Sequence, residues 1–300
     1  MPNLALVISV LIPTYNHVVV NLVNELSNQI KQSQLTAEII VLDDGSTDAI
    51  KQQNEAIARI PGVHYEELPV NIGRAAIRNE LSTRAHHPYL LYLDADSTVV
   101  DDDFLKAYVA SIDGQNVLVG GRVYRSERPP EEYLLHWRYG RQRETQSLVQ
   151  RQQRPASFFH SNNVLIPKSL ECSFTQAEKG YGYEDLALGQ TLLRDGVKIV
   201  HLENPVLHDQ LDTNRDFIYK HNQALVNLAA SLRAKATLGT RLGSIYLKMR
   251  KLPLGVQVMG LFKGLETGLK ERLLKGQAPL WYFDLYRLLL LHHLYESDTE

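Results

Sequence analysis

The sequence has little of what would stabilise a small secreted protein or anchor a protein across a membrane. Its only cysteine, Cys172, excludes an internal disulfide and any zinc site built from cysteines, as is usual in a reducing compartment. No stretch reaches the roughly 18–20 apolar residues that a membrane-spanning helix needs. The first residues lack the basic segment and the small-residue cleavage site of a secretory signal, so we expect a cytoplasmic chain.

Glycine-rich phosphate loops are also absent. The sequence contains no Gly-x-x-x-x-Gly-Lys-Ser/Thr motif, and no Gly-x-Gly-x-x-Gly motif follows the first predicted strand. What the sequence does have is the composition of an ordinary globular enzyme: 300 residues, of which 44% are hydrophobic and 22% are charged. This length fits one large domain, or one domain with an appendage.

The net charge of -2 hides a strongly basic segment near the C-terminus. Residues 232–276 contain ten basic and two acidic side chains, and the rest of the chain is acidic. Leucines recur there with a spacing of four, at Leu261, Leu265, Leu269 and Leu273. Either this segment makes a peripheral contact with an anionic membrane, at its inner face, or its helices pack as a subdomain with a solvated basic face. We expect no nucleic-acid binding, because the acidic remainder would repel it and no nucleic-acid motif is present.

Apolar runs alternate with amphipathic runs over the first 125 residues, which predicts strand–helix units around a largely parallel sheet. A polar stretch, 125–154, is predicted to be a long loop with some helix. From about Asp212 the pattern is helical, with breaks at Pro253 and Pro279. The sequence thus predicts an α/β domain over 1–211 and a helical region over 212–300. The predicted strands are Leu6–Ile12, Glu38–Leu42, Val63–Leu68, Tyr89–Leu93, Val117–Val123, Asn163–Pro167, Lys198–Leu202 and Pro205–His208, and the predicted helices of the first domain are Val19–Lys31, Thr47–Ile60, Arg74–Arg84, Asp103–Ile112 and Asp185–Arg194.

Polar clusters follow three of the predicted strands. They are Pro13-Thr14-Tyr15-Asn16, Asp43-Asp44-Gly45-Ser46 and Asp94-Ala95-Asp96. Ligands of open α/β sheets gather outside the carboxyl ends of the strands, so we expect these clusters to share one edge. Such a pocket would be acidic and would require a cation. Two carboxylates two residues apart suit a hard divalent ion that also takes phosphate oxygens.

The segment Gly180–Leu188 places two carboxylates, Glu184 and Asp185, at the start of a predicted helix. Carboxylates at a helix N-terminus are stabilised by the helix dipole, which is one explanation for this pair. The other explanation is catalytic, because removing a proton from a hydroxyl requires a fixed carboxylate beside a surface for the substrate. The presence of Asp94-Ala95-Asp96 earlier in the chain favours the catalytic explanation.

Five motifs in this order resemble family 2 glycosyltransferases with the GT-A fold, over roughly residues 7–210. They are Ser9–Asn16, Asp43–Asp48, Asn71–Arg74 with Arg78-Asn79, Asp94–Asp96 and Gly182–Asp185. The resemblance implies a Rossmann-like, mostly parallel mixed sheet flanked by helices, and an inverting transfer of sugar from a UDP-sugar with Mn2+ or Mg2+. The Gly-Tyr-Gly-Tyr-Glu-Asp-Leu stretch is also similar to a motif of galactosyl- and N-acetylgalactosaminyl-transferases.

The resemblance implies roles for the residues of the donor side. Pro13 and Tyr15 would lie against the uracil, and Asp44 would accept a hydrogen bond from it. Arg78 would reach the ribose or the phosphates, and Asp94 would contact the ribose or the surroundings of the metal. Apart from the resemblance, Asn162 and Asn163 precede a predicted strand and could hydrogen-bond the donor sugar, although asparagine is also common in turns before strands.

The resemblance implies a second set of roles for the metal and the acceptor. Asp96 would bind the metal ion, and His208 stands where related enzymes supply a further metal ligand, although a lone histidine is more often structural. Asp185 would accept the proton of the acceptor hydroxyl, and Glu184, the rival base, would orient the loop or bind the acceptor. The acceptor would be a glycan, glycolipid or polysaccharide, and its sugar would stack on a platform made of Tyr181, Gly182 and Tyr183.

Two other functions stay open at this point. A sugar-nucleotide nucleotidyltransferase could share the sheet, but it would want a glycine-rich basic loop where Pro13-Thr14-Tyr15-Asn16 stands. A non-catalytic protein that binds nucleotide sugars or glycans is the second alternative, and the intact Asp94, Asp96 and Asp185 argue against it.

Overall fold

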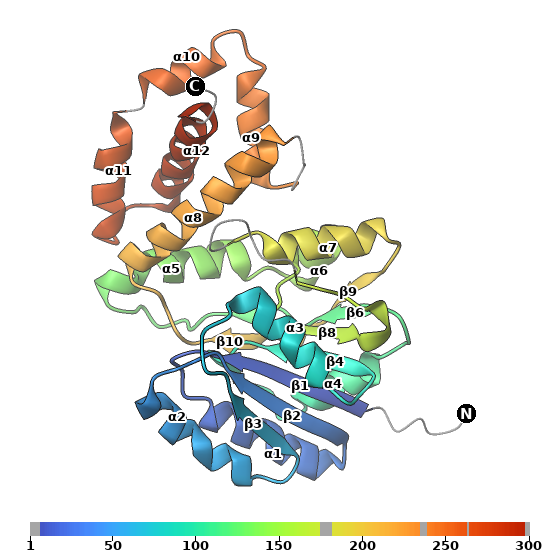
Figure 1. Ribbon diagram of the computed structural model, residues 1–300. Helices are drawn as coiled ribbons and strands as arrows, with labels where there is room; N and C mark the ends of the chain where they lie inside the picture. The colour runs from blue at the N-terminus through green and yellow to red at the C-terminus, as the bar shows by residue number, and fades with distance from the viewer. Residues whose placement is uncertain (1–6, 175–181, 235–238, 263, 298–300) are drawn as a thin grey trace. The chain divides into compact units, whose positions relative to one another are not determined.

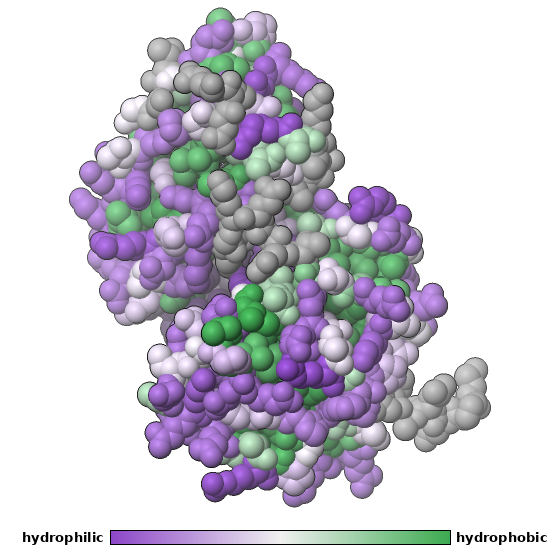
Figure 2. Space-filling model, in the orientation of Figure 1, coloured by the Kyte–Doolittle hydropathy of each residue, from purple (hydrophilic) through white to green (hydrophobic). Residues whose placement is uncertain are grey.

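The computed structural model describes residues 7–174, 182–234, 239–262 and 264–297, which form two compact units. The sheet unit comprises the described residues of 1–123, 146–176 and 188–209, and the helical unit comprises those of 124–145, 177–187 and 210–300. Each unit has hydrophobic cores of its own. On the surface visible in Figure 2, most residues are hydrophilic and the hydrophobic ones form small groups.

A seven-stranded mixed sheet, in the order β3-β2-β1-β4-β8-β6-β9, is the frame of the sheet unit (Figure 1). Strands β3, β2, β1 and β4 are parallel, β8 is antiparallel to both of its neighbours, and β6 and β9 are parallel. This agrees with the predicted mostly parallel mixed sheet. The strands are β1 (Val7–Thr14), β2 (Thr36–Asp43), β3 (Val63–Glu67), β4 (Tyr89–Leu93), β6 (Val117–Val119), β8 (Asn163–Pro167) and β9 (Ile199–His201).

Helices cover both faces of this sheet, because the buried strands are apolar on both sides. Successive side chains of a strand point to opposite faces. Val10 and Ile12 of β1 pack in one core with α1 and α4, whereas Leu11 packs in the other core with α3 and the part of α7 from Leu188. The helices of this unit are α1 (Val20–Ser33), α2 (Asp48–Asn54), α3 (Arg74–Arg84), α4 (Phe104–Ser111), α6 (Leu148–Gln153) and α7 (Glu184–Arg194, of which the first turn belongs to the helical unit), with 3-10 turns at Glu55–Arg59, Pro155–Phe158 and Lys168–Leu170.

A second, three-stranded sheet has the order β5-β10-β7. Its strands are β5 (Ser97–Val99), β7 (Arg122–Val123) and β10 (Val206–His208), and β10 is antiparallel to β5 and parallel to β7. The prediction of one strand over Val117–Val123 was wrong, because the chain leaves the large sheet at Gly120-Gly121. A Cβ atom on Gly120 would lie 2.3 Å from the Asn163 Nδ2 and Asn204 O atoms, and Gly121 has a φ of 93°.

The helical unit contains α5 (Leu134–Tyr139), α8 (Asn214–Arg233), α9 (Arg241–Arg250), α10 (Gly255–Leu261), α11 (Leu265–Leu274) and α12 (Leu280–Ser297), together with a 3-10 turn at Glu131–Tyr133 and a π-helical turn at Gly140–Glu144. Helices α8 and α12 lie side by side (Figure 1). The predicted breaks at Pro253 and Pro279 are confirmed, and the chain also breaks after Arg233 and after Leu261. Within the described ranges, no helix has the length and apolar character that spanning a membrane would require.

Candidate active site

The order of the strands brings the three predicted polar clusters to one edge of the large sheet. Strand β1 is paired in parallel with β2 on one side, where Thr14 lies opposite Asp43, and with β4 on the other. The carboxyl ends of the three strands therefore lie together, which confirms the expectation of a shared edge. The strand order changes direction at β1, and such switch points are where open α/β sheets bind their ligands.

The loops after β1 and β2 hold each other through polar contacts. The Asn16 N–H donates to Ser46 Oγ at 2.7 Å, and the Thr47 N–H donates to Asn16 Oδ1 at 3.0 Å. Asn16 has a φ of 50°, a conformation that asparagine tolerates better than most residues. Pro13 is half-buried at the base of this loop and Tyr15 is 54% exposed, so the ring of Tyr15 is available to a ligand.

Asp44 is a buried carboxylate that fixes the loop after β3. Its Oδ1 accepts from the Ile72 N–H at 2.7 Å and its Oδ2 accepts from the Gly73 N–H at 3.1 Å. Burial raises the pKa of Asp44, and these two hydrogen bonds offset part of that rise. Gly45 allows this approach, because a Cβ atom there would lie 2.9 Å from Asn71 N. A carboxylate has lone pairs beyond the two used here, so the predicted contact to a base stays chemically available.

Arg78 and Asp94 form a buried ion pair across α3 and the end of β4. Arg78 Nη2 lies 2.5 Å from Asp94 Oδ1, and Arg78 Nη1 donates to the Arg74 carbonyl at 3.2 Å. The side chain of Arg78 is only 3% exposed and lies over the ring of Phe174, whereas that of Asp94 is 22% exposed. The first partner of Arg78 is therefore Asp94, a contact that the sequence did not indicate.

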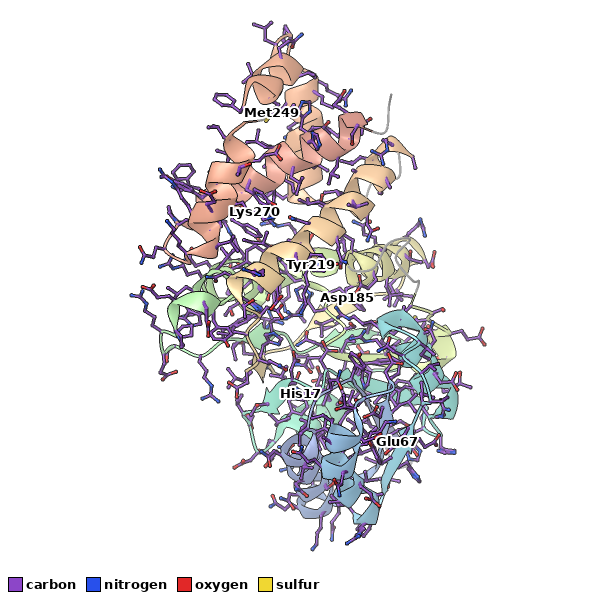
Figure 3. All side chains as sticks on the ribbon, turned by 60° about the vertical axis from the view of Figure 1, so that its left-hand side comes forward. His17, Glu67, Asp185, Tyr219, Met249 and Lys270 are labelled. Carbon is purple, nitrogen blue, oxygen red and sulfur yellow. The ribbon has the colours of Figure 1, made fainter. Side chains whose placement is uncertain are left out.

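Asp96 and His208 meet at the turn between β4 and β5. His208 Nδ1 lies 3.4 Å from Asp96 Oδ2. Burial by itself raises the pKa of Asp96, but the hydrogen bond and charge of His208, with smaller effects of Arg122 and His17, lower it to about 2. His17 follows β1 at the same edge (Figure 3). These surroundings favour the ionised form of Asp96.

This pair fits the divalent ion that the sequence predicts. Asp96 Oδ1 is buried and has no hydrogen-bond partner among the described residues, so one carboxylate oxygen is left over beside an imidazole. Carboxylate oxygen and imidazole nitrogen are both ligands of Mn2+, and oxygen suits Mg2+. In the part of the chain that the structure describes, no three His, Cys, Asp or Glu side chains form a metal-binding group. Phosphate oxygens and water would have to supply the other ligands.

The two asparagines before and in β8 differ in their contacts. Asn163 is fully buried, donates from Nδ2 to the Gly121 and Asn204 carbonyls at 2.9 Å, and accepts at Oδ1 from the Tyr108 hydroxyl at 2.6 Å. Asn162 accepts at Oδ1 from Arg122 Nη2 at 3.0 Å, and its buried Nδ2 has no partner among the described residues. The side chain of Asn163 is thus occupied within the protein, while that of Asn162 keeps a donor.

The predicted acceptor side lies in the helical unit. The Gly182 N–H donates to Glu184 Oε2 at 2.9 Å, so Glu184 ties the backbone of its own loop. Gly182 has a φ of 110°, and a Cβ atom there would lie 2.4 Å from Ala224 Cβ on α8. Tyr183 has a φ of 72° and packs against the core of this unit. Asp185 follows Glu184 in the first turn of α7 (Figure 3), and Tyr181 lies outside the described residues.

Sequence reasoning missed Arg122 and Ser97 at the donor edge. Arg122 binds Asn162 and adds positive charge near Asp96. Ser97, which begins β5, is buried, and its Oγ has no partner among the described residues. The one signal for Arg122 was its place after Gly120-Gly121, where a tight turn follows a strand.

A model of the family "Glycosyl transferase family 2" matches residues 9–174, which is more than half of the chain and includes the polar strand ends of the donor edge. The chain belongs to glycosyltransferase family 2. An uncharacterized glycosyltransferase of Haemophilus influenzae is 34% identical to this family 2 member over 100 residues, which make up 33% of this chain and 40% of that relative. The match therefore spans less than half of the relative.

Solved structures show the same fold at low identity. The mannosyltransferase PcManGT from Pyrobaculum calidifontis, in complex with GDP-Man and Mn2+, gives a TM-score of 0.58 at 14% identity and covers 97% of this chain and 86% of its own. TarS of S. aureus, residues 1–349 in complex with UDP-GlcNAc, gives a TM-score of 0.52 at 20% identity, and the match covers 97% of this chain and 91% of the TarS chain. The predicted GT-A-type fold is confirmed by these similarities.

Proposed function

We propose that this family 2 member is a metal-dependent, inverting glycosyltransferase that moves a sugar from a UDP-sugar to a hydroxyl of a glycan or glycolipid. The observation that carries the proposal is the edge at the ends of β1, β2 and β4, where Asp96 keeps an unused oxygen beside His208. The bound nucleotide sugars of PcManGT and TarS, which share the fold, support a nucleoside diphosphate sugar as the donor.

On the donor side, Tyr15 and Pro13 cover the uracil, and Asp44 accepts a hydrogen bond from it. Asp94 contacts the ribose, and Arg78 holds Asp94 in place instead of binding the nucleotide itself. Asn162 and Arg122 are better candidates than Asn163 for contacting the UDP-sugar, because the side-chain amide of Asn163 already forms hydrogen bonds within the protein. Asn163 supports the site by fixing the strand pair that carries His208.

Asp96 and His208 are the residues that would hold Mn2+ or Mg2+. When bound there, the ion supplies positive charge that stabilises the phosphate oxygens of the departing UDP. Asp96 suits this position because its surroundings favour the charged carboxylate. His208 favours Mn2+ over Mg2+, since imidazole is a ligand of softer ions.

On the acceptor side, Asp185 accepts the proton of the attacking hydroxyl. Glu184 orients the loop, because its carboxylate already accepts the Gly182 N–H. Gly182 and Tyr183 belong to the platform for the acceptor sugar, and its third predicted member, Tyr181, lies outside the described residues. Attack from the side opposite the leaving group inverts the anomeric centre. The Gly-Tyr-Gly-Tyr-Glu-Asp-Leu stretch makes UDP-galactose and UDP-N-acetylgalactosamine the first donors to test.

The first experiment measures nucleotide release from four UDP-hexoses and from GDP-mannose, with Mn2+, with Mg2+ or with EDTA, followed by an acceptor search with the best donor. We expect turnover of a UDP-sugar that EDTA abolishes, and an anomeric configuration in the product, read by NMR, that is opposite to the donor's. Asp96→Asn and His208→Gln should each weaken UDP–Mn2+ binding by at least tenfold. Turnover that is unchanged in EDTA would contradict the metal assignment.

The second experiment separates catalysis from binding. Asp185→Asn should keep UDP–Mn2+ binding within about twofold and lower transfer by roughly 100-fold or more, as expected for loss of a general base. The matched control is Asp195→Asn, because Asp195 follows the other end of α7 and its side chain is 63% exposed. Full turnover of Asp185→Asn would refute the assignment of the base.

A further inference from the structure

Four exposed apolar side chains lie on α10, at its two caps and at the start of α11, all in the helical unit. Leu254, Val258, Phe262 and Leu265 are 66%, 41%, 46% and 48% exposed. Leu254, Val258 and Phe262 are four residues apart along α10 and its two caps, which places them on one side of that helix, whereas Leu265 begins the next helix. Large apolar side chains are individually common on surfaces, but several on one side of a helix indicate a contact site. We call these four residues the apolar line.

The apolar line is distinct from the face with which these helices pack. Gly255 and Met259, each one residue further along, are buried, and Leu269 and Leu273 of α11 are buried in a core of the helical unit. Of the leucines that recur every four residues, Leu269 and Leu273 are therefore buried and Leu265 is exposed. The buried side chains account for the packing of these helices, so the exposed apolar side chains are not required to hold them together.

A tight corner between α9 and α10 extends the apolar line. The Leu252 N–H donates to the Met249 carbonyl and the Gly255 N–H to the Leu252 carbonyl, and a Cβ atom on Gly255 would lie 1.8 Å from Met249 O. This close turn leaves Lys251, Leu252 and Leu254 exposed at its tip, with Leu252 at 60%. Met249 is labelled on α9, and Lys270 on α11, in Figure 3.

Exposed lysines lie on α9 and α11 and in the turns that follow them. Lys248, Lys251, Lys270 and Lys275 are exposed, and none of them has an ion pair within the described ranges. Arg250 and Arg272 are partly occupied, by Glu296 and by the Tyr282 hydroxyl. Four lysines of the basic segment are thus exposed and form no ion pair with another described residue.

This combination fits a lipid surface better than a protein partner. The cores of protein interfaces are depleted in lysine and enriched in arginine, tyrosine and tryptophan. Amphipathic helices that lie on bilayers instead combine leucine and phenylalanine with lysines, which reach the anionic headgroups on long apolar stems. Each lysine near such a surface contributes to binding through the negative surface potential.

We propose that the apolar line and the four lysines form a docking surface for an anionic lipid bilayer. The apolar side chains enter the boundary between headgroups and acyl chains, and the lysines contact the headgroup phosphates. The proposal is independent of the glycosyl transfer proposed above, since it concerns only where the chain binds. If this surface does not bind lipid, the transfer of sugar to a soluble acceptor should therefore be unaffected.

The test is co-sedimentation of the full chain with vesicles of phosphatidylcholine alone or with 30% phosphatidylglycerol, at low and high salt. We expect at least tenfold stronger partition to the anionic vesicles, and a loss of that preference at high salt. A triple variant should weaken partition to the anionic vesicles by roughly tenfold to 100-fold. It combines Lys248→Gln, Lys251→Gln and Lys270→Gln. Equal partition to both vesicles, or no dependence on salt, would overturn the proposal.

A matched pair of triple variants tests the apolar line. Leu254→Ser with Val258→Ser and Phe262→Ser should weaken partition at least tenfold. Val100→Ser, Val149→Ser and Leu193→Ser form the control, because these side chains are 55%, 63% and 40% exposed in the sheet unit. The control should bind as the unchanged protein does. Equal loss in both triples, or a concentration-dependent dimer in ultracentrifugation that only the first triple abolishes, would refute membrane docking.

Discussion

Removal of the Asp94 carboxylate should destabilise the protein more than removal of its arginine partner. Arg78 is 3% exposed and Asp94 is 22% exposed, so only the carboxylate can be rehydrated when its partner is lost. Breaking a buried ion pair costs about 3–5 kcal/mol, because a charge is left uncompensated. We expect Asp94→Ala to cost in that range. Arg78→Met, which keeps most of the volume, should cost about 2 kcal/mol, since water replaces part of the lost interaction.

The double variant gives the sharper result. Arg78→Met in the Asp94→Ala background removes the stranded guanidinium, so it should recover about 1–3 kcal/mol relative to Asp94→Ala alone. The exposed pair Lys106–Asp103, with side chains 59% and 68% exposed, is the control. Removing either of its members should change the free energy of unfolding by no more than about 0.5 kcal/mol.

The assay has to report on the sheet unit. Trp137 and Trp281 both belong to the helical unit, so tryptophan fluorescence would follow the other half of the molecule. Urea unfolding by far-UV circular dichroism, with hydrogen exchange of α3 and β4 by mass spectrometry, follows the correct region. A double variant as unstable as the sum of the two single variants would refute the reasoning, because it would mean that the two charges do not interact.

Two further predictions concern the helical unit. Gly182→Ala should cost about 2–4 kcal/mol, because it adds a clash with Ala224 to a backbone strain of about 1–3 kcal/mol. Gly196, with a φ of 80° and no neighbour within 4 Å, is the control, and Gly196→Ala should show the strain alone. Equal losses of stability in thermal unfolding would contradict this prediction. Burial, with a smaller effect of Arg287, lowers the pKa of His221 to about 3, so the unfolded chain binds a proton below pH 6.5 that the folded chain excludes. Stability should be full above pH 6.5 and fall toward pH 3 by up to about 1.4 kcal/mol per unit, and His221→Phe should flatten that slope in urea titrations at several pH values.

The fold was largely predictable where single segments carry the signal. Arg74–Arg84, Tyr89–Leu93 and Asn163–Pro167 have the predicted bounds, because amphipathic spacing and apolar runs are local properties. Strand β5 was not predicted, since Ser97–Val99 is three residues long and is defined by its pairing with β10. The stretch 125–154, predicted as a loop with some helix, contains α5 and α6, which are only six residues each.

The candidate site was predictable in its location but not in its contacts. Parallel strands put the clusters after β1, β2 and β4 at one edge, which follows from topology alone. The pairing of Arg78 with Asp94 and the burial of Asn163 against Asn204 depend on side chains far apart in the chain. Such pairs leave no trace in local spacing. Whether the predicted residues bind donor, metal and acceptor as proposed stays a prediction.

The antiparallel pairing of β8 with β4 has a consequence for synthesis on the ribosome. Strands β1 to β4 can pair as soon as residue 93 has left the ribosome. The other edge of β4 stays unpaired until Asn163–Pro167 has been synthesised, about 70 residues later. At roughly 5–20 residues per second, this edge is open for several seconds. Leu91 and Leu93 are fully buried in the finished sheet, so the nascent chain exposes an apolar strand to its neighbours during that interval. Translation speed between β4 and β8 should therefore affect the yield of folded protein.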